Sequence, residues 1–372
     1  METALDLLPD PIRTILAFVI VLGVLVFIHE LGHYLAARWR GVHVEAFSIG
    51  FGRPLLSWTD RRGTAWRVAW IPLGGYVKLH GQERPEEATP EERARWRHGE
   101  TFHEKPVGSR AIVVAAGPIA NFVLAAVLFA GLFMVVGQPR QDADSTTVGT
   151  VSANSAAARA GLRPGDHILS LDGTPVARFE DIQRHIQPRA GQPVAVRVER
   201  DGAPLDLTAT PEGRGEGGRG LLGISAITMH RLDPLSALAA GVTHTADISG
   251  QTLSGVWQMI VGRRGTEELG GPLRIAQLSG QVAELGIASL ISFMAILSVN
   301  LALINLFPIP VLDGGHLVFY ALEAIRGRPL PPRAVEYGFR AGFALLATLF
   351  IFATWNDLAN LGIIRWVAGL VG

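Results

Sequence analysis

The fold of this chain is decided by residues 17–35, which read AFVIVLGVLVFIHELGHYL. The apolar part of this stretch, extended by the residues before it, is long enough for a membrane-spanning helix. Near its end stand two histidines and a glutamate. Ionisable side chains at the centre of a span cost about 2.5–3.5 kcal/mol each on insertion scales, so they are rare without a function. We therefore expect a functional site inside this helix.

The order of these polar residues is His-Glu-x-x-His, with His29, Glu30 and His33. Residues four apart lie on the same face of an α-helix, so both imidazoles can bind one metal ion. The intervening glutamate can act as the general base toward a water that zinc activates. The motif therefore indicates a zinc metalloprotease.

The composition indicates a membrane protein with soluble insertions. Charged residues make up 18% of the 372 positions, below the roughly 25% of soluble domains, and the mean hydropathy is positive. The formal net charge is zero. The chain therefore lacks the excess of basic residues that would indicate a nucleic-acid partner. The absence of cysteine excludes disulfides and a cysteine-ligated zinc site.

A cleaved signal peptide is the alternative interpretation of the N-terminus. Its head is acidic, with Glu2, Asp6 and Asp10 and only Arg13 as a basic residue, whereas signal peptides have a basic head and a shorter apolar core. Cleavage near residues 35–37 would also remove His-Glu-x-x-His. We therefore expect a retained membrane span.

The hydropathy pattern predicts a polytopic α-helical membrane protein with about four transmembrane helices. The spans are expected at residues 14–37, 110–136, 286–322 and 335–357, followed by an interfacial tail at 358–372.

The second span contains Gly117-Pro118, which predicts a kink, and Asn121, which needs a hydrogen-bond partner in lipid. We expect Asn121 to support helix packing and not catalysis, because polar packing residues are common in membrane helices.

Residues 38–109 form a polar region with a β-rich first half and a charged connector. Strands are expected near 44–51, 55–58, 64–70 and 76–79, with a hairpin turn at Asp60-Arg-Arg-Gly63. The excess of Lys and Arg places this membrane-associated region in the cytoplasm and the N-terminus outside.

Residues 142–213 contain short predicted strands and helices separated by turns, which indicates a soluble α/β insertion on the outer side. The glycine-rich segment 213–220 is expected to be a flexible linker. Residues 233–285 are amphipathic and are expected to lie on the outer membrane surface, or alternatively to cross the membrane.

A catalytic zinc commonly has three protein ligands, so a third is expected elsewhere in the chain. Asp313 is the strongest candidate, because it lies in a span that prolines and glycines must break, and His316 is the nearest rival. With four spans, His33 and Asp313 both fall in the cytoplasmic third of the membrane. A crossing by 233–262 would put them on opposite sides, which favours four spans.

His29-Glu-Leu-Gly-His33 together with Asn305-Leu-Phe-Pro-Ile-Pro-Val-Leu-Asp313-Gly resembles the site-2 protease family of intramembrane zinc metalloproteases. The resemblance covers nearly the whole chain and is greatest to the bacterial branch of regulator-of-sigma-E proteases. The pattern from Gly161-Leu-Arg-Pro-Gly-Asp to Asp172-Gly is similar to bacterial PDZ domains. The chain has room for one such domain, whereas some members carry two.

The resemblance implies that Asp313 is the third zinc ligand and that Asn305, Pro308 and Pro310 help to position substrate. It implies that the β-rich region pairs with an unwound substrate strand. It also implies a location in the bacterial inner membrane, with the N-terminus and the PDZ domain periplasmic. The implied substrates are transmembrane segments such as those of anti-sigma factors, after a first cut by a site-1 protease. Remnant signal peptides are the other substrate class.

Two other functions remain open from the residues. One is a non-catalytic membrane scaffold that binds C-termini through the PDZ domain and holds zinc as a structural element; the intact Glu30 argues against it. The other is zinc transport, which would need more polar residues along a path than the spans offer. For the PDZ-like insertion, peptide binding, exclusion of bulky substrates and a plain packing role are the alternatives.

Overall fold

The computed structural model describes residues 10–82, 88–94, 96–141, 145–214, 218–265 and 270–360. The chain divides into two compact units, which are described separately below. The first comprises residues 1–131 and 237–372, and the second residues 132–236.

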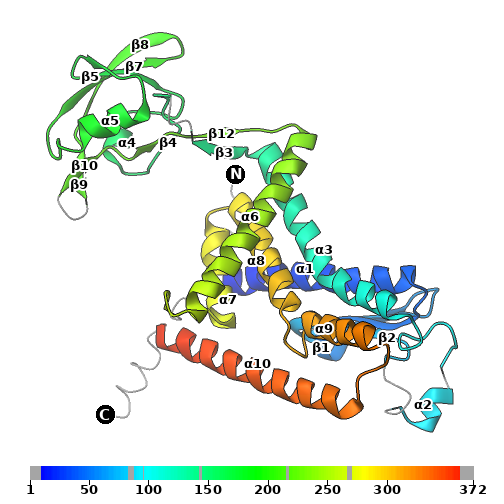
Figure 1. The fold of residues 1–372 in the computed structure, drawn as a ribbon. Helices are drawn as coiled ribbons and strands as arrows, with labels where there is room; N and C mark the ends of the chain where they lie inside the picture. Colours follow the sequence, from blue (N-terminus) through cyan, green and yellow to red (C-terminus); the bar gives the residue numbers. More distant parts are fainter. Residues whose placement is uncertain are drawn as a thin grey trace. The chain divides into compact units, whose positions relative to one another are not determined.

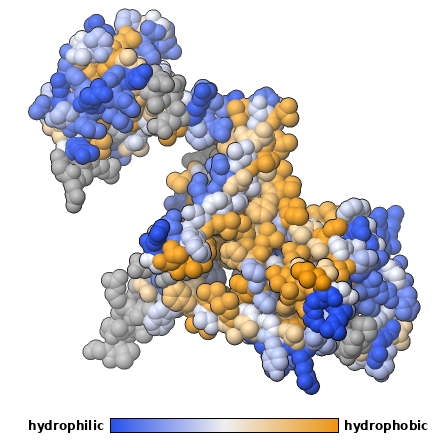
Figure 2. Space-filling view, in the orientation of Figure 1, coloured by the Kyte–Doolittle hydropathy of each residue, from blue (hydrophilic) through white to orange (hydrophobic). Residues whose placement is uncertain are grey.

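Long apolar helices dominate the first unit (Figure 1). Among the described residues, four helices are long and apolar enough to cross a membrane: α1 (Asp10–Trp39), α3 (Val107–Val135), α8 (Ile287–Leu306) and α10 (Pro332–Asn360). In Figure 2, hydrophobic residues, coloured orange, cover much of the visible surface of the first unit. The predicted number of spans is confirmed. The interfacial tail predicted at 358–372 lies almost wholly outside the described residues.

The third predicted span is broken, as its prolines and glycines require. Helix α8 ends at Leu306, and a separate helix, α9 (Asp313–Arg326), begins at the motif aspartate. Pro308 and Pro310 lack backbone N–H groups, and the intervening backbone follows no regular ladder. An irregular backbone of this kind is tolerated at membrane depth only within protein or a hydrated cavity.

The segment 233–285 contains two helices. Helix α6 (Pro234–Ile260) packs on α3, since a Cβ on Gly241 would lie 2.4 Å from the Ala126 carbonyl oxygen. Helix α7 (Pro272–Glu284) packs on α1 and α8, with Ala283 in the cluster that contains Val21 and Leu290. A further contact is the ion pair between Arg13 and Glu284. The amphipathic faces are therefore at least partly covered by protein.

The β-rich region forms one sheet of two long, bent strands, β1 (Val44–Thr59) and β2 (Ala65–Leu79). Residues 44–49 of β1 pair with 75–79 of β2 and also lie beside 65–68, while 54–59 pair with 65–69. The bends explain why the sequence pattern resembled four short strands. The predicted turn is confirmed: the Asp60 carbonyl accepts from Gly63 N–H, and its carboxylate accepts from Thr64 N–H.

The sheet is held against α1 and α3 by aromatic packing. Phe47 is 1% exposed and contacts Phe27 and Trp66, with ring centroids 5.7 and 4.5 Å apart. Tyr34, Val113 and Leu79 complete the same buried cluster. This packing places the end of β2 beside the middle of α1. A short helix, α2 (Pro90–Ala94), lies in the connector to α3.

The second unit is an α/β domain with a four-stranded sheet of order β6–β5–β7–β8. Its strands are β5 (His167–Leu171), β6 (Thr174–Pro175), β7 (Val194–Arg200) and β8 (Ala203–Ala209). The helices are α4 (Ala156–Arg159) and α5 (Phe179–Ile186). Short strand pairs complete it: β4 (Thr150–Val151) with β11 (Ile224–Ser225), and β3 (Gln138–Gln141) with β12 (Ile227–His230).

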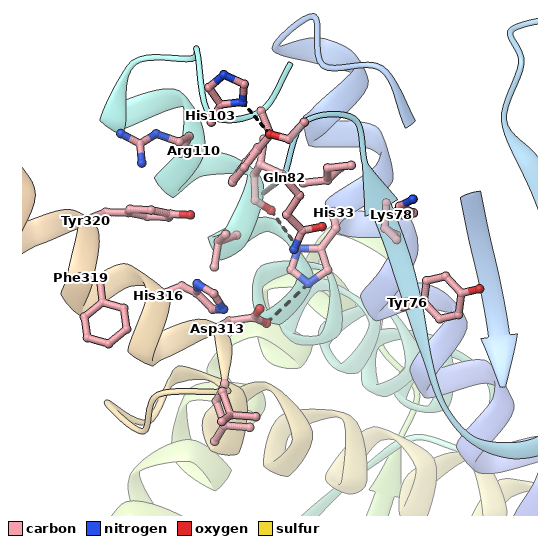
Figure 3. A pocket seen from close by; sticks show the side chains of 18 of the residues that line it. His33, Tyr76, Lys78, Gln82, His103, Arg110, Asp313, His316, Phe319 and Tyr320 are labelled. Carbon is pink, nitrogen blue, oxygen red and sulfur yellow. Dashed lines mark hydrogen bonds and ion pairs between the residues drawn. The ribbon is translucent and has the colours of Figure 1, made fainter. Parts of the chain in front are cut away.

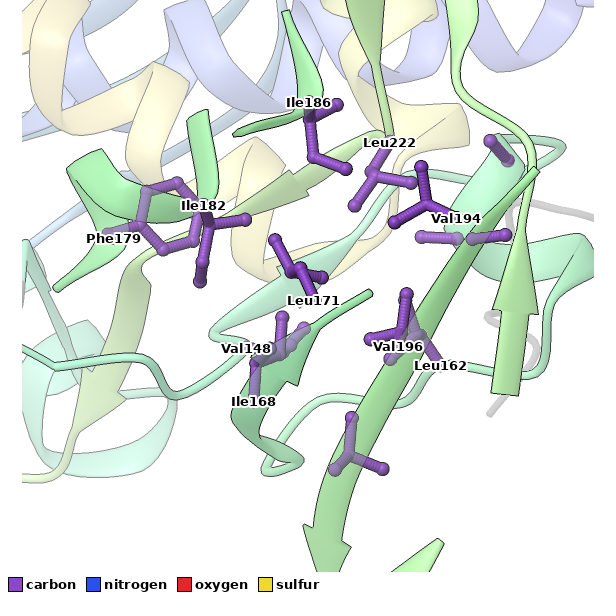
Figure 4. Packing of buried hydrophobic residues seen from close by; sticks show 14 of the residues in the cluster. Val148, Leu162, Ile168, Leu171, Phe179, Ile182, Ile186, Val194, Val196 and Leu222 are labelled. Atoms are coloured by element: carbon purple, nitrogen blue, oxygen red, sulfur yellow. The ribbon is translucent and has the colours of Figure 1, made fainter. Parts of the chain in front are cut away.

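Alternating side chains of the sheet meet one face of α5 in the core of this domain (Figure 4). Val194, Val196 and Val198 are each at most 1% exposed, and Ile182 and Ile186 of α5 cover them. The β7–β8 hairpin turns at Asp201 and Gly202, both with positive φ, as an Asp-Gly hairpin turn requires.

The prediction of a flexible linker at 213–220 is wrong for the described residues of this segment. β9 (Glu212–Arg214) pairs with β10 (Arg219–Leu221), and the chain continues into the core at Leu222. Gly220 serves close packing: its N–H donates to the Gln187 carbonyl, and a Cβ there would lie 2.3 Å from the Ile186 carbonyl oxygen. Glycine is present at this position because a backbone lies against it, and not for flexibility.

One buried ion pair fixes the turn before β5. The Asp166 carboxylate, 1% exposed, accepts from Arg200 Nε and Nη2 at 2.7 Å each and from the Arg163 backbone N–H at 2.8 Å. Burial raises the pKa of Asp166, but the hydrogen bonds from Arg200 and Arg163 outweigh it and hold the pKa below its ordinary value.

We expect Asp166→Asn to destabilise this domain, because Arg200 loses its anionic partner. Since the folded-state pKa of Asp166 is lowered, its contribution is full above the unfolded pKa of about 3.9 and disappears as the pH falls through the folded value. Hydrogen exchange of β5 and β7 amides across pH 7 to 3 measures both effects. Asp206→Asn, which breaks an exposed pair with Arg197, is the control and should change exchange little. Equal protection in wild type and Asp166→Asn would contradict the expectation.

Candidate metal centre

The site is built on a close contact between α1 and α3. A Cβ on Gly32 would lie 2.3 Å from the Ala116 carbonyl oxygen, and a Cβ on Gly117 would lie 2.3 Å from His33 Nε2 and 2.9 Å from His29 Cε1. Each glycine therefore gives room to the other helix. Small residues at such contacts let membrane helices approach closely. Here the approach lays both imidazole rings against the surface of α3.

Three potential ligand atoms converge beside Gly117. His29 Nε2 and His33 Nε2 are 3.2 Å apart, and Asp313 Oδ2 lies 3.2 Å from the first and 3.5 Å from the second. Figure 3 shows Asp313 pointing from the start of α9 toward His33. The Asp313 Oδ2 atom is buried and has no hydrogen-bond partner among the described residues.

This arrangement fits a tetrahedral zinc ion. Zinc–nitrogen and zinc–oxygen bonds of about 2.0–2.1 Å at tetrahedral angles place the ligand atoms roughly 3.3 Å apart. The three separations of 3.2, 3.2 and 3.5 Å agree with that spacing. Two histidines and one carboxylate form a donor set that zinc accepts, with a fourth position left for water or substrate.

Asp313 is positioned by the break between α8 and α9. The chain turns back so tightly that a Cβ on Gly314 would lie 2.3 Å from the carbonyl oxygens of Leu306 and Phe307. Val311 has φ of 100°, a rare conformation for a β-branched residue. Strain of this kind is retained where the surrounding structure fixes it, commonly at functional sites.

Glu30 lies between the histidines and the sheet. It is buried at 9% exposure, and a Cβ on Gly75 would come within 3.0 Å of its Cγ. Gly75 therefore allows β2 to pass close to the carboxyl-bearing side chain. On one side, residues 75–79 pair with β1, and no other described strand pairs with their second edge.

A cavity of about 1260 Å³ joins these parts. Its lining includes His29, Glu30, His33, Asp313 and residues 75–79 of β2, whose second edge has no described strand partner. Figure 3 shows His33, Asp313, Tyr76 and Lys78 around this cavity. The cavity gives an extended chain room to lie beside the three potential ligands.

Helix α9 is also tied to α3 at the cavity wall. Arg110 Nη2 donates to Glu323 Oε1 at 2.6 Å, and the guanidinium lies 5.0 Å from the Tyr320 ring centroid. Both charged side chains are nearly buried, at 13% and 11% exposure. The pair holds the C-terminal half of α9, while Asp313 lies at its start.

Of the remaining residues predicted from the sequence, some line the cavity and others do not. Asn305 lines the cavity. Pro308 is exposed, Pro310 packs against Gly338 and Gly342 of α10, and neither of these described prolines lines the cavity. His316 lines it one turn after Asp313, with its ring 5.3 Å from that of Phe339, and is outside the three-residue cluster found among the described residues.

Sequence reasoning missed the role of Gly32 and Gly117 and assigned Asn121 to helix packing. The structure places the Asn121 side chain 3.3 Å from His29 Nδ1. A signal was present: Gly117 and Asn121 are four residues apart, the same spacing as His29 and His33, so each pair occupies one helix face.

The fold and the cluster are those of a protein with span-length apolar helices and, among them, a buried group of residues able to hold a metal ion. Comparison with known proteins identifies the family: the model of "Peptidase family M50" matches residues 17–349. A Rhizobium meliloti (strain 1021) protein, whose name describes it as a zinc metalloprotease, is 44% identical over 98% of this chain and 100% of its own length. The metalloprotease MmpA of Caulobacter vibrioides is 39% identical, with 96% and 98% covered.

The regulator of sigma-E protease RseP of Salmonella typhimurium is 34% identical over 93% of this chain and 98% of its own length. Among solved structures, the PDZ domain of the SdrC-like protein of Listeria monocytogenes is 21% identical, covers 22% of this chain and 85% of that domain, and has a TM-score of 0.20. The chain belongs to peptidase family M50. It is a zinc metalloprotease of the membrane.

We expect Gly117→Ala to lower zinc affinity by about tenfold or more, because the new methyl group must displace the imidazoles that lie on α3. Zinc content after dialysis against a chelator measures this. Gly131→Ala is the matched control on the same helix, since its Cβ would meet nothing within 4 Å. Full zinc content in Gly117→Ala would refute the close contact described above.

Proposed function

We propose that this zinc metalloprotease is an intramembrane endopeptidase in which His29, His33 and Asp313 bind the zinc ion and Glu30 is the general base. The observation that carries the proposal is the tetrahedral spacing of three potential ligand atoms, two from the membrane-type helix α1 and one from the start of α9. A bound metal ion satisfies two imidazole nitrogens and a carboxylate oxygen that converge so closely in a mostly buried site.

The chemistry is the hydrolysis of a peptide bond. Zinc bound at this site supplies Lewis acidity, which polarises the scissile carbonyl and lowers the pKa of water. Glu30 takes a proton from the attacking water and later gives it to the departing amine, so the base and the acid are the same carboxyl group. Glu30 follows His29 directly on α1, so the same helix carries the general base and two of the proposed zinc ligands.

The substrate backbone is proposed to pair with the edge of β2 that has no described strand partner. A transmembrane helix shields its peptide bonds with internal hydrogen bonds, so it must unwind before hydrolysis. Residues 75–79 line the cavity and have one edge without a described strand partner. Strand addition at this edge satisfies the exposed backbone groups and holds the peptide extended beside Glu30. Asn305, also on the cavity wall, is proposed to contact the same peptide.

The substrates are proposed to be single-span membrane proteins of the anti-sigma-factor type, trimmed first by a site-1 protease. Support comes from the relative named as a regulator of sigma-E protease, which covers nearly the whole chain. Remnant signal peptides are the other candidates. A substrate with a short outer part suits a site that lies within the bilayer.

We also propose an orientation in the bacterial inner membrane, with the N-terminus and the second unit periplasmic and the metal site in the cytoplasmic third. The basic residues of 38–109 support it through the positive-inside tendency. The second unit is proposed to be a PDZ domain, because a helix over a small antiparallel sheet follows the Gly161–Asp166 turn. It would bind substrate termini or exclude bulky ones.

We expect Glu30→Gln to retain zinc and to reduce cleavage of a membrane-embedded reporter by at least about a thousandfold, since the proton acceptor is lost. Asp313→Asn should lose both zinc and activity. Metal analysis of the purified variants, combined with a reporter assay in cells, separates these roles. A non-catalytic scaffold predicts unchanged function in Glu30→Gln, so full reporter cleavage in that variant would refute the proposal.

The orientation can be tested by cysteine labelling, because the natural chain has no cysteine. Ala177→Cys lies at an exposed position of the second unit, and Glu91→Cys at an exposed position of α2. A membrane-impermeant maleimide added to spheroplasts should label only the first variant and should reach the second after permeabilisation. The reverse pattern would overturn the proposed topology.

A further inference from the structure

Both histidines of the cluster direct their second ring nitrogen, Nδ1, at helix α3. His33 Nδ1 lies 2.9 Å from the Val113 carbonyl oxygen, and His29 Nδ1 lies 3.3 Å from the Asn121 side-chain amide. The hydrogen-bond partner of the second ring nitrogen sets which nitrogen carries the proton in a metal-binding histidine. The two contacts therefore decide whether the Nε2 atoms can accept a metal.

For His33, the Val113 carbonyl determines the ring tautomer. A carbonyl oxygen only accepts hydrogen bonds, so the proton of the neutral ring is on Nδ1 and the Nε2 lone pair is free for zinc. Proline at 118 has no N–H for the Val114 carbonyl, so the hydrogen-bond ladder of α3 is interrupted next to Val113.

For His29, the orientation of the Asn121 side-chain amide determines the ring tautomer. With Nδ2 facing the ring, the amide donates to Nδ1 and the proton of a neutral ring must be on Nε2, which faces His33 and Asp313. That tautomer cannot bind zinc through Nε2. In the same orientation Asn121 Oδ1 is buried without a hydrogen-bond partner. The oxygen and nitrogen of an amide are exchanged by a half-turn of the group, and their assignment follows from the hydrogen bonds they make.

We propose that Asn121 is a positioning residue for the metal site: its Oδ1 accepts the Nδ1 proton of His29 and so keeps Nε2 free for zinc. The proposal rests on the ligand assignment made under the proposed function. Asn121 is fully buried, so water does not compete for this hydrogen bond. Helix α3 would then orient both rings in the same tautomer, through a backbone carbonyl at 113 and a side-chain carbonyl at 121.

The chain offers a matched control for a purely structural role. Ser298 Oγ of α8 donates to the backbone carbonyl of Asn121 at 2.8 Å and is fully buried. That hydrogen bond joins α3 to α8 and does not involve the Asn121 side chain. Asn121→Leu therefore removes the contact with His29 and keeps the interhelical bond, whereas Ser298→Ala does the opposite.

The experiment measures zinc affinity of the detergent-purified full chain by competition with a chromophoric chelator, together with thermal unfolding of the metal-free protein. We expect Asn121→Leu to weaken zinc binding about 10- to 100-fold, the usual effect of losing a residue that orients a ligand. Asn121→Asp keeps an acceptor for Nδ1–H and should restore affinity to within a few-fold of wild type. Ser298→Ala should bind zinc as wild type does.

Unchanged zinc affinity in Asn121→Leu would overturn the proposal, and so would equal losses in the Leu and Asp variants. If Asn121→Leu does not fold, Asn121→Asp decides alone: its affinity within a few-fold of wild type supports the acceptor role, and a loss above tenfold rejects it. His29→Ala separates the two levels of inference. Wild-type zinc affinity in His29→Ala would refute the ligand assignment itself, whatever the Asn121 variants show.

Discussion

The metal site depends on the contact between α1 and α3 at Gly32 and Gly117. Three polar groups within an apolar layer are stable only if protein and metal satisfy them, because lipid offers no hydrogen bonds. Side chains larger than hydrogen at 32 and 117 would separate the helices and tilt the imidazoles away from Asp313. The two glycines thus turn an unfavourable pair of buried histidines into one wall of a metal site.

The second wall comes from a different kind of element. Asp313 stands at the start of α9, immediately after a backbone segment that is irregular and, at Val311, strained. The Arg110–Glu323 pair fixes the other half of α9 to α3. Helix α3 therefore contacts the histidines of one wall directly and is tied, through Arg110, to the helix that carries Asp313. The sheet lines the same cavity without contributing a residue to the cluster.

Much of this was predictable from the sequence, and the remainder was not for physical reasons. The clustering of His29, His33 and Asp313 was predictable because side chains of the metal-ligand type inside apolar runs are rare enough to be recognised. The four spans followed from hydropathy. The segment 213–220 was misinterpreted because glycine permits both flexibility and close backbone contact, and only the packing of Gly220 on α5 distinguishes them. The contact of the Asn121 side chain with His29 was not foreseen, because it depends on which ring the side chain faces across two helices.

The separation of the ligands along the chain has a consequence for biogenesis. His29 and His33 emerge early in synthesis, whereas Asp313 lies near the far end, after the whole second unit. Domains and helices synthesised first fold first. If His29, His33 and Asp313 bind the zinc ion as proposed, the first span enters the membrane before its histidines can meet Asp313, and zinc binding is one of the last steps of maturation. A nascent protease of this design is inactive until nearly all of it has been inserted.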